Sequence, residues 1–105
     1  MSVNVMLEVQ SKPESIDQLK STFISILPDT RSYDGCLGVK VMGNQDESLN
    51  LILHESLNLI LHETWETREK YEKYLAWRAE TGALEALGAM LSQPPSIRYY
   101  DNLDI

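Results

Sequence analysis

The chain of 105 residues has the length of one ordinary domain, and its 43% hydrophobic and 24% charged residues are typical of globular proteins. Nine Lys and Arg against sixteen Asp and Glu give a formal net charge of −7, so we expect neither nucleic acid nor an anionic membrane as a partner. The single cysteine, Cys36, excludes an intramolecular disulfide and a multi-cysteine zinc site.

The first two elements follow from residue periodicity. Aliphatic side chains occupy every odd position over residues 3–9, which predicts a strand with one apolar face. Residues 11–14 fit a capping box with a proline in the first turn. Apolar residues then recur at helical spacing over residues 16–27, which predicts an amphipathic helix that ends near Pro28.

The later elements are separated by turn and cap signals. Residues 33–35, Tyr-Asp-Gly, indicate a turn, and alternation over residues 37–41 predicts a second strand. Thr67 is suited to be the N-cap of a helix, and Gly82 is suited to end it. The remaining predicted elements are a strand region within residues 47–62, a short helix over residues 84–91 stopped by two prolines, and a last strand over residues 96–100.

The predicted order is β-α-β-β-α-β, which is typical of the α+β ferredoxin-like fold: a split β-α-β arrangement with one four-stranded antiparallel sheet. Because the predicted helices cover only one face of such a sheet, we expect the other face to be buried against a second copy in a homodimer. The N-terminus has no basic and apolar leader, and no apolar run approaches the roughly 18–20 residues of a membrane span. We therefore expect a single cytoplasmic domain over residues 1–105.

The sequence ESLNLILH occurs twice in tandem, at residues 47–54 and 55–62. Because eight is an even number, the duplication keeps the strand phase. Either copy can enter the sheet, or one long strand can pair with another chain. We favour the second copy, since it leads directly into the following helix while the hairpin loop lengthens at small entropic cost. A first copy that packs on a partner, and a duplication without function, both remain open.

Aromatic residues around the helix predicted between Thr67 and Gly82 are the best candidates for chemistry, since no phosphate loop, metal motif or nucleophile motif is present. Trp65 lies at the junction of strand and helix, where it can stack on a flat substrate or pack in the core. Tyr71, Tyr74 and Trp77 extend this aromatic region. A tyrosine hydroxyl can donate to a substrate oxygen, and core packing is the alternative role for each.

His62 and Asn4 are the polar candidates. A histidine can take a proton from an acidic phenol near neutral pH, whereas a surface role on the strand is the alternative. His54 and His62 are one residue duplicated, and in-phase positions eight apart on a strand lie about 26 Å apart, too far to share a metal ion. Asn4, on the polar face of the first strand, can hydrogen-bond a ligand or solvent.

The chain resembles the antibiotic biosynthesis monooxygenase family of dimeric α/β-barrel proteins over nearly its whole length outside the extra eight residues. The matching segments are the alternating first strand, Lys12–Glu14, Gly35–Gly38, Leu61–Glu66, Tyr74–Gly82 and Pro94–Tyr100. The resemblance implies a ferredoxin-like fold, dimerisation through the sheets, and a pocket between sheet and helices. It matches Trp65 and Tyr71 to the family's pocket Trp and Tyr, and it places Leu61 where the family has an Asn.

The resemblance implies a cofactor-independent monooxygenase, in which a phenolic or quinol-like substrate is deprotonated and itself reduces O₂. Trp65, Tyr71 and His62 would be catalytic, and Asn4, Tyr74 and Trp77 would bind substrate, without metal. One alternative is a non-catalytic small-molecule-binding or stress-response module of the same fold. Another is a haem-handling protein, although the predicted helix region 74–85 offers no His ligand.

Overall fold

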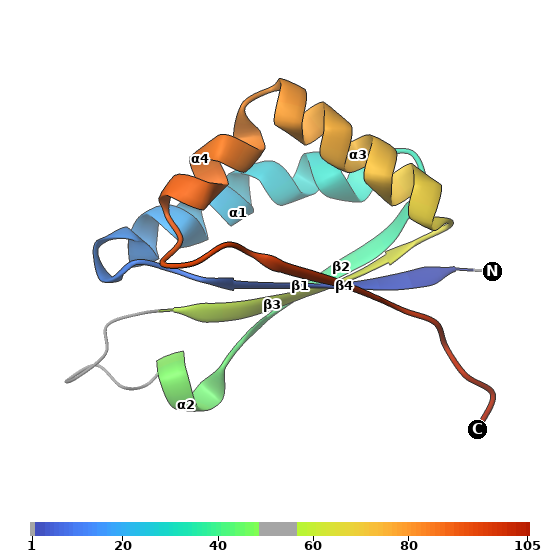
Figure 1. The fold of residues 1–105 in the computed structure, drawn as a ribbon, viewed down its shortest axis with the longest axis horizontal. Helices are drawn as coiled ribbons and strands as arrows, with labels where there is room; N and C mark the ends of the chain where they lie inside the picture. The colour runs from blue at the N-terminus through green and yellow to red at the C-terminus, as the bar shows by residue number, and fades with distance from the viewer. Residues whose placement is uncertain (1, 49–56) are drawn as a thin grey trace.

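One antiparallel sheet and three helices on one of its faces make up most of the molecule (Figure 1). The computed structural model describes residues 2–48 and 57–105. In chain order the elements are β1 (Val3–Gln10), η1 (Pro13–Ser15), α1 (Ile16–Ser32), β2 (Cys36–Gly43), α2 (Gln45–Ser48), β3 (Asn58–Trp65), α3 (Arg68–Glu80), α4 (Ala83–Ala89) and β4 (Ser96–Tyr100). This order and topology confirm the predicted α+β ferredoxin-like fold.

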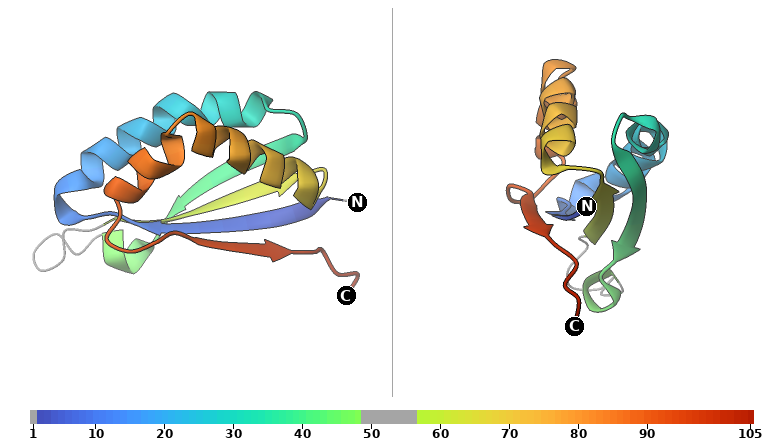
Figure 2. Two further views of the ribbon diagram at one scale, coloured as in Figure 1. Left: turned by 45° about the horizontal axis from the view of Figure 1, so that its top comes forward. Right: turned by 90° about the vertical axis from the view of Figure 1, so that its right-hand side faces the viewer.

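The four strands are arranged in the order β2-β3-β1-β4, and every neighbouring pair is antiparallel. β1 and β3 are therefore the central strands, and they pair in register from Val3 with Trp65 to Gln10 with Asn58. The helices α1, α3 and α4 lie side by side over the same sheet face in all three ribbon views (Figures 1 and 2). Because alternate strand residues share a face, the odd-numbered residues of β1 and β3 point toward these helices.

Helix α1 continues four residues past Pro28, so the predicted end near that proline is wrong. Pro28 lies on the exposed side of the helix, and so does Ile24, whose carbonyl loses the N–H that a proline cannot supply. Solvent can satisfy this carbonyl. The buried side chain of Leu27 packs in the core before the proline, and Thr30 after it is hydrogen-bonded to Tyr74 and Arg78 of α3, so packing outweighs the local cost of the missing hydrogen bond.

The predicted capping box is also wrong, whereas the later caps are confirmed. The turn at Pro13–Ser15 is a 3-10 helix without a side-chain cap. The Ser11 hydroxyl instead is buried and accepts a hydrogen bond from the Leu57 backbone N–H at 2.8 Å, because it lies beside the start of β3. Thr67 does cap α3, since its hydroxyl accepts from the Lys70 N–H at 3.1 Å.

The second copy of the repeated sequence supplies the sheet strand, as expected. Residues 58–62 of that copy form the first part of β3 and pair with β1, and residues 59–62 also pair with β2. Leu57, Leu59 and Leu61 are buried toward the helices. The first copy contributes Glu47 and Ser48 to α2, and the proposal that it packs on a partner concerns residues 49–54, which lie outside the described residues.

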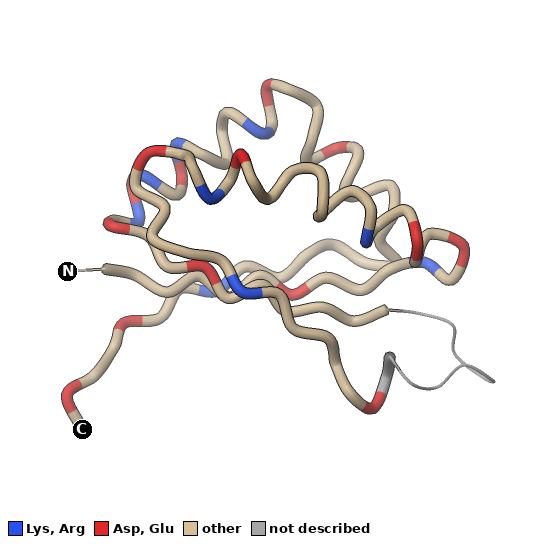
Figure 3. The backbone as a smooth tube through the Cα atoms, turned by 180° about the vertical axis from the view of Figure 1, so that it is seen from behind, with Lys and Arg blue, Asp and Glu red and all other residues tan. Residues whose placement is uncertain are grey.

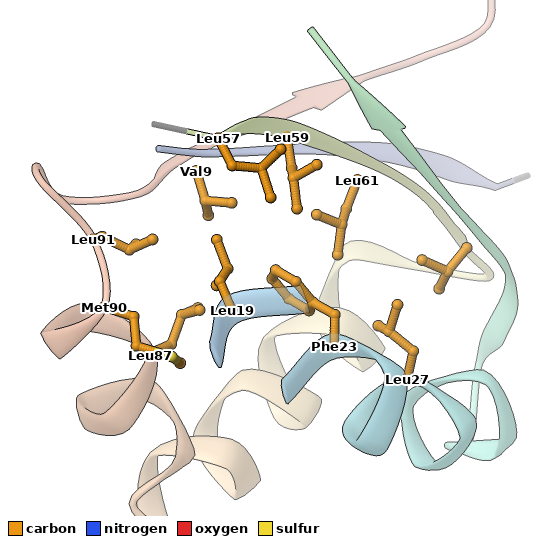
Figure 4. Close-up of a cluster of buried hydrophobic side chains, with 11 residues drawn as sticks. Val9, Leu19, Phe23, Leu27, Leu57, Leu59, Leu61, Leu87, Met90 and Leu91 are labelled. Atoms are coloured by element: carbon orange, nitrogen blue, oxygen red, sulfur yellow. The ribbon is translucent and has the colours of Figure 1, made fainter. Parts of the chain in front are cut away.

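The hydrophobic core fills the space between the sheet and the helices and has two parts. The first joins the leucines of β3 and Val9 to side chains of α1 and of the α4 region (Figure 4). Its labelled members point toward one another from the sheet, from α1 (Leu19, Phe23, Leu27) and from the end of α4 (Leu87, Met90, Leu91). The second part is aromatic and is built around Trp65, Tyr71 and Tyr74 with Val3 and Val5.

Basic and acidic positions are interspersed along the helices of the described chain (Figure 3). The ion pair of Arg68 with Glu72 lies along α3, where residues four apart face each other, and Lys70 of α3 pairs with Glu66, which precedes the helix. Among the described residues, no helix is long and apolar enough to cross a membrane.

Candidate functional site

A cavity of about 180 Å³ lies between the sheet and the helices. Leu7, Leu61 and Glu63 of the central strands line it from the sheet side. The other lining residues are Thr22, Phe23 and Ile26 of α1, Tyr71, Tyr74, Leu75 and Arg78 of α3, and Ala83, Leu84, Ala86 and Leu87 of α4. Most of these side chains are apolar, so the cavity is suited to a hydrophobic ligand that carries a few polar atoms.

Glu63 is the acidic residue in this lining. It lies two positions after Leu61 and two before Trp65, so the alternation of β3 turns it toward the helices. The residue is only 3% exposed, and the indole Nε1 of Trp65 donates a hydrogen bond to its Oε1 at 3.0 Å. Burial raises the pKa of Glu63 above its ordinary value of 4.5, and the Trp65 hydrogen bond and the charge of Arg78 offset part of this rise.

Arg78 is the cation of the cavity, and a buried network holds it in place. Its Nε donates to the Tyr74 hydroxyl at 2.9 Å, and its Nη2 donates to the Thr30 hydroxyl at 3.0 Å and to the Ile26 carbonyl at 2.9 Å. The hydroxyls of Thr30 and Tyr74 also share a hydrogen bond of 2.6 Å. This network links α3 to α1 and fixes the guanidinium at the cavity wall.

Tyr71 differs from Tyr74 although both are buried on the same helix. Among the described residues, the Tyr71 hydroxyl has no hydrogen-bond partner, and no residue donates to the second carboxylate oxygen of Glu63. Burial, together with the nearby charge of Glu63, raises the pKa of Tyr71, so its hydroxyl remains a proton donor. Two buried polar groups of the cavity lining therefore keep hydrogen-bonding capacity that the described residues do not use.

The structure brings Trp65, Tyr71 and Tyr74 together, as the sequence predicts. Their rings form neighbouring pairs, with centroid distances of 5.5 Å between Trp65 and Tyr71 and 5.1 Å between Trp65 and Tyr74. Tyr71 and Tyr74 line the cavity, whereas the fully buried Trp65 lies behind Glu63 and reaches the cavity through its hydrogen bond to that carboxyl. Trp77 stacks on Tyr33 with 5.3 Å between centroids and is outside the lining.

His62 and Asn4 lie on the opposite, open face of the sheet. The His62 Nε2 and the Asn4 Oδ1 are 2.9 Å apart and share a hydrogen bond. Both residues line a groove of about 440 Å³ with residues of β1, β3, β4 and the C-terminal segment, including Arg98 and Tyr100. The sheet thus separates His62 and Asn4 from the aromatic candidates, and the predicted residues form two groups instead of one site.

Glu63, Arg78 and Thr30 are the functional candidates that the sequence prediction missed. The signal for Glu63 was present: it is the charged residue among Leu57, Leu59, Leu61 and Trp65 on the buried face of one strand. Arg78 follows Tyr71 and Tyr74 at helical spacing on the same face of α3. The partnership of Arg78 with Thr30 depends on how α1 and α3 pack, which no local pattern encodes.

The cavity offers a hydrogen-bond acceptor, a donor and a fixed positive charge within an apolar chamber. Such a set can take a proton from a bound hydroxyl and stabilise the resulting anion. Among the described residues, no group of three or more His, Cys, Asp or Glu is placed to hold a metal ion.

Solved structures share this architecture over nearly the full length of the chain. A crystal structure of an antibiotic biosynthesis monooxygenase matches with a TM-score of 0.79 and 19% identity, over 96% of this chain and 98% of that chain. The chain has the fold of the antibiotic biosynthesis monooxygenases. A mutant of SnoaB, described as a cofactor-independent oxygenase from Streptomyces nogalater, matches with a TM-score of 0.75 and 11% identity, over 99% of this chain and 95% of that chain.

The crystal structure of a conserved protein from Methanosarcina mazei Go1 also matches, with a TM-score of 0.80 and 17% identity over 95% of this chain and 91% of that chain. No protein-family model matches the sequence, and no curated protein matches it. Similarity at these identities establishes the fold, and one fold supports many activities. The activity has to be argued from the residues of the cavity.

Proposed function

We propose that the protein is a cofactor-independent monooxygenase that oxidises a phenolic or quinol-like aromatic small molecule with O₂. The observation that carries this proposal is the buried Glu63 carboxyl, which lines an apolar cavity and keeps one oxygen free for a ligand. The similarity in fold to SnoaB, described as a cofactor-independent oxygenase, agrees with it. In this reaction the substrate supplies the electrons, so the protein has to supply a base, a chamber and charge stabilisation.

The reaction begins when Glu63 accepts the proton of the substrate hydroxyl. The phenolate gives one electron to O₂, and the resulting superoxide and phenoxyl radical combine to form a carbon–oxygen bond at the ring carbon opposite the hydroxyl. Glu63 returns its proton to the peroxide. Cleavage of the O–O bond with loss of the ring hydrogen at that carbon releases water and leaves a quinone. One oxygen atom enters the product and the other leaves as water.

Each residue of the cavity has a defined task in this scheme. Arg78, held by Tyr74 and Thr30, stabilises the phenolate and the peroxide by its fixed charge. The Tyr71 hydroxyl, which stays protonated, donates to the substrate oxygen. Trp65 is a positioning residue, because its indole N–H holds the Glu63 carboxyl in place. His62 and Asn4 have no part in this step, since they lie on the other sheet face.

We also propose that the protein is a homodimer that packs through the open sheet face. The helices α1, α3 and α4 leave this face uncovered (Figure 2). Met6, Ile60 and Met42 lie there among polar residues, with Met42 45% exposed. An antiparallel sheet face with exposed apolar side chains is stabilised by burial against a second copy. Light scattering tests this arrangement, and a monomer at all concentrations would overturn it.

Oxygen consumption in the presence of a panel of phenols, hydroquinones and anthrones tests the monooxygenase proposal. We expect turnover by the wild-type protein and a loss of at least a hundredfold in kcat for Glu63→Gln, because general-base catalysis contributes roughly 10²–10⁴-fold. Glu69→Gln is the matched control, since Glu69 is exposed on α3 outside the cavity. Equal activity of Glu63→Gln and wild type would refute the role of Glu63.

A binding module without catalysis is the second candidate, and one observation favours it. Leu61, where the resembling family has an Asn, lines the cavity with an apolar side chain. If the missing amide is essential for the reaction with O₂, the cavity still binds a phenol but does not turn it over. Tight binding of one of the phenols, hydroquinones or anthrones without oxygen uptake would support the binding module. No histidine lines the described cavity, so a haem bound there would lack a histidine ligand.

A further inference from the structure

We propose that the substrate is a single-ring phenol, bound with its hydroxyl at the Glu63 end of the cavity. This inference rests on the proposed function, and it goes further by fixing the size and the direction of the ligand. Two independent observations carry it: the volume of the cavity and the placement of the polar groups that have no hydrogen-bond partner among the described residues.

The volume is that of one aromatic ring with a small substituent. An apolar cavity of about 150 Å³ in a protein core is sufficient to bind benzene. The cavity here measures about 180 Å³, so one ring fills most of it and leaves room for a small polar group. A hydroxyl fits in this space, whereas a second fused ring would have to extend outward past Leu84 or move α1 and α4 apart.

The polar groups set the direction of the ligand. Glu63 is nine-tenths or more buried, and its second carboxylate oxygen accepts no hydrogen bond from any described residue. Arg78 uses its Nε and Nη2 for the protein network, and no described residue accepts from its Nη1. The Tyr71 hydroxyl is equally unpartnered. A phenol oxygen has the complementary chemistry, because it can donate its proton to Glu63 and accept a hydrogen bond from Arg78 or Tyr71.

The rest of the lining is suited to the ring. Leu7 and Leu61 face it from the sheet, and Phe23 and Leu87 face it from α1 and α4. Leu61, Phe23 and Leu87 point into the same space between the layers (Figure 4). On the outer side the lining includes Leu84, which is 39% exposed and therefore borders solvent. A phenol that enters from this side has its ring near the helices and its hydroxyl directed toward Glu63.

Calorimetric titration of the whole protein without oxygen tests the inference with four probes: benzene, phenol, 1-naphthol and anthrone. We expect phenol to bind at least tenfold more tightly than benzene and at least tenfold more tightly than 1-naphthol, and anthrone not to bind. In Glu63→Gln the preference for phenol over benzene should shrink at least tenfold, whereas Glu69→Gln should keep it. Tighter binding of 1-naphthol or anthrone than of phenol would overturn the inference.

A cavity variant adds a second readout that does not depend on Glu63. Leu84→Ala removes a partly exposed side chain and keeps the core, so it should fold and should bind 1-naphthol at least tenfold more tightly than the wild type. An unchanged affinity for 1-naphthol would contradict the size limit. Oxygen uptake separates the two proposals: phenol binding without turnover overturns the monooxygenase alone, and preferred turnover of anthrone overturns the size limit alone.

Discussion

Two substitutions that each remove a phenolic hydroxyl from the same helix should differ strongly in their effect on stability. Tyr71→Phe and Tyr74→Phe each delete one buried phenolic hydroxyl from α3. The Tyr74 hydroxyl is bonded to Arg78 Nε at 2.9 Å and to the Thr30 hydroxyl at 2.6 Å. The Tyr71 hydroxyl has no partner among the described residues. The pair therefore isolates the hydrogen bonds, since ring size and helix position are matched.

The expected magnitudes follow from these contacts. A hydrogen bond to a charged group contributes about 1.5–3 kcal/mol and a neutral one about 0.5–1.5 kcal/mol, so Tyr74→Phe should cost about 2–4 kcal/mol of unfolding free energy. Tyr71→Phe removes a buried hydroxyl that is not satisfied, so it should be neutral or stabilising by up to about 1 kcal/mol. The gap of about 3 kcal/mol corresponds to roughly 12 °C in Tm.

Urea denaturation of both variants and the wild type at one chain concentration measures this gap, and thermal melting provides a second estimate. The same Tyr71→Phe protein should bind phenol more weakly, because the free hydroxyl is then missing from the cavity. An equal loss of stability in Tyr71→Phe and Tyr74→Phe would contradict this prediction, since the Tyr71 hydroxyl would then have a partner within the protein.

Three further predictions concern other parts of the chain. The folded state holds the pKa of Glu63 above its ordinary value of 4.5, so the folded protein keeps that proton to a higher pH than the unfolded chain does. The wild type should therefore lose stability relative to Glu63→Gln as pH rises above about 4.5. Urea titrations from pH 4 to 8 that show a constant difference in unfolding free energy would contradict this. Deletion of residues 47–54 leaves the second copy of the repeat in front of β3 and shortens the connection from Gly43 to Asn58. The deletion should stabilise the fold by about 0.7 kcal/mol, with unchanged assembly by light scattering. A loss of more than about 2 kcal/mol of unfolding free energy would show that the first copy packs. Gly35→Ala should lower stability by about 2 kcal/mol in thermal melts, because the backbone φ of Gly35 is +93° and the new Cβ would lie 2.5 Å from Lys70 Cδ. Gly38→Ala is the control and should cost less, since no atom lies within 4 Å of its new Cβ.

The fold could be predicted from the sequence because its signals are local. Alternation along β1 and β3 and the Thr67 cap each depend on neighbouring residues, and together they give the element order. The end of α1 could not be predicted in this way. Pro28 breaks a local rule, and only the packing of Leu27 and Thr30 against the rest of the protein explains why the helix continues.

The site could be predicted in part. Trp65 and Tyr71 belong to one aromatic cluster, as expected. His62 and Trp65 are an odd number of residues apart on one strand, so their side chains point to opposite faces, and this rule was sufficient to separate them. The same rule places Glu63 with Trp65. The hydrogen bond between Arg78 and Thr30 could not be predicted from the sequence, because it depends on the distance between two helices.

A crystal structure of the protein with phenol, prepared without oxygen, tests the central claim most directly. The proposal predicts the ring in the cavity between Leu61 and α1, α3 and α4, with the phenol oxygen within hydrogen-bond distance of the Glu63 carboxyl. A ring bound instead in the groove beside His62 and Asn4 on the open sheet face would contradict the claim, and so would an unchanged cavity at saturating phenol.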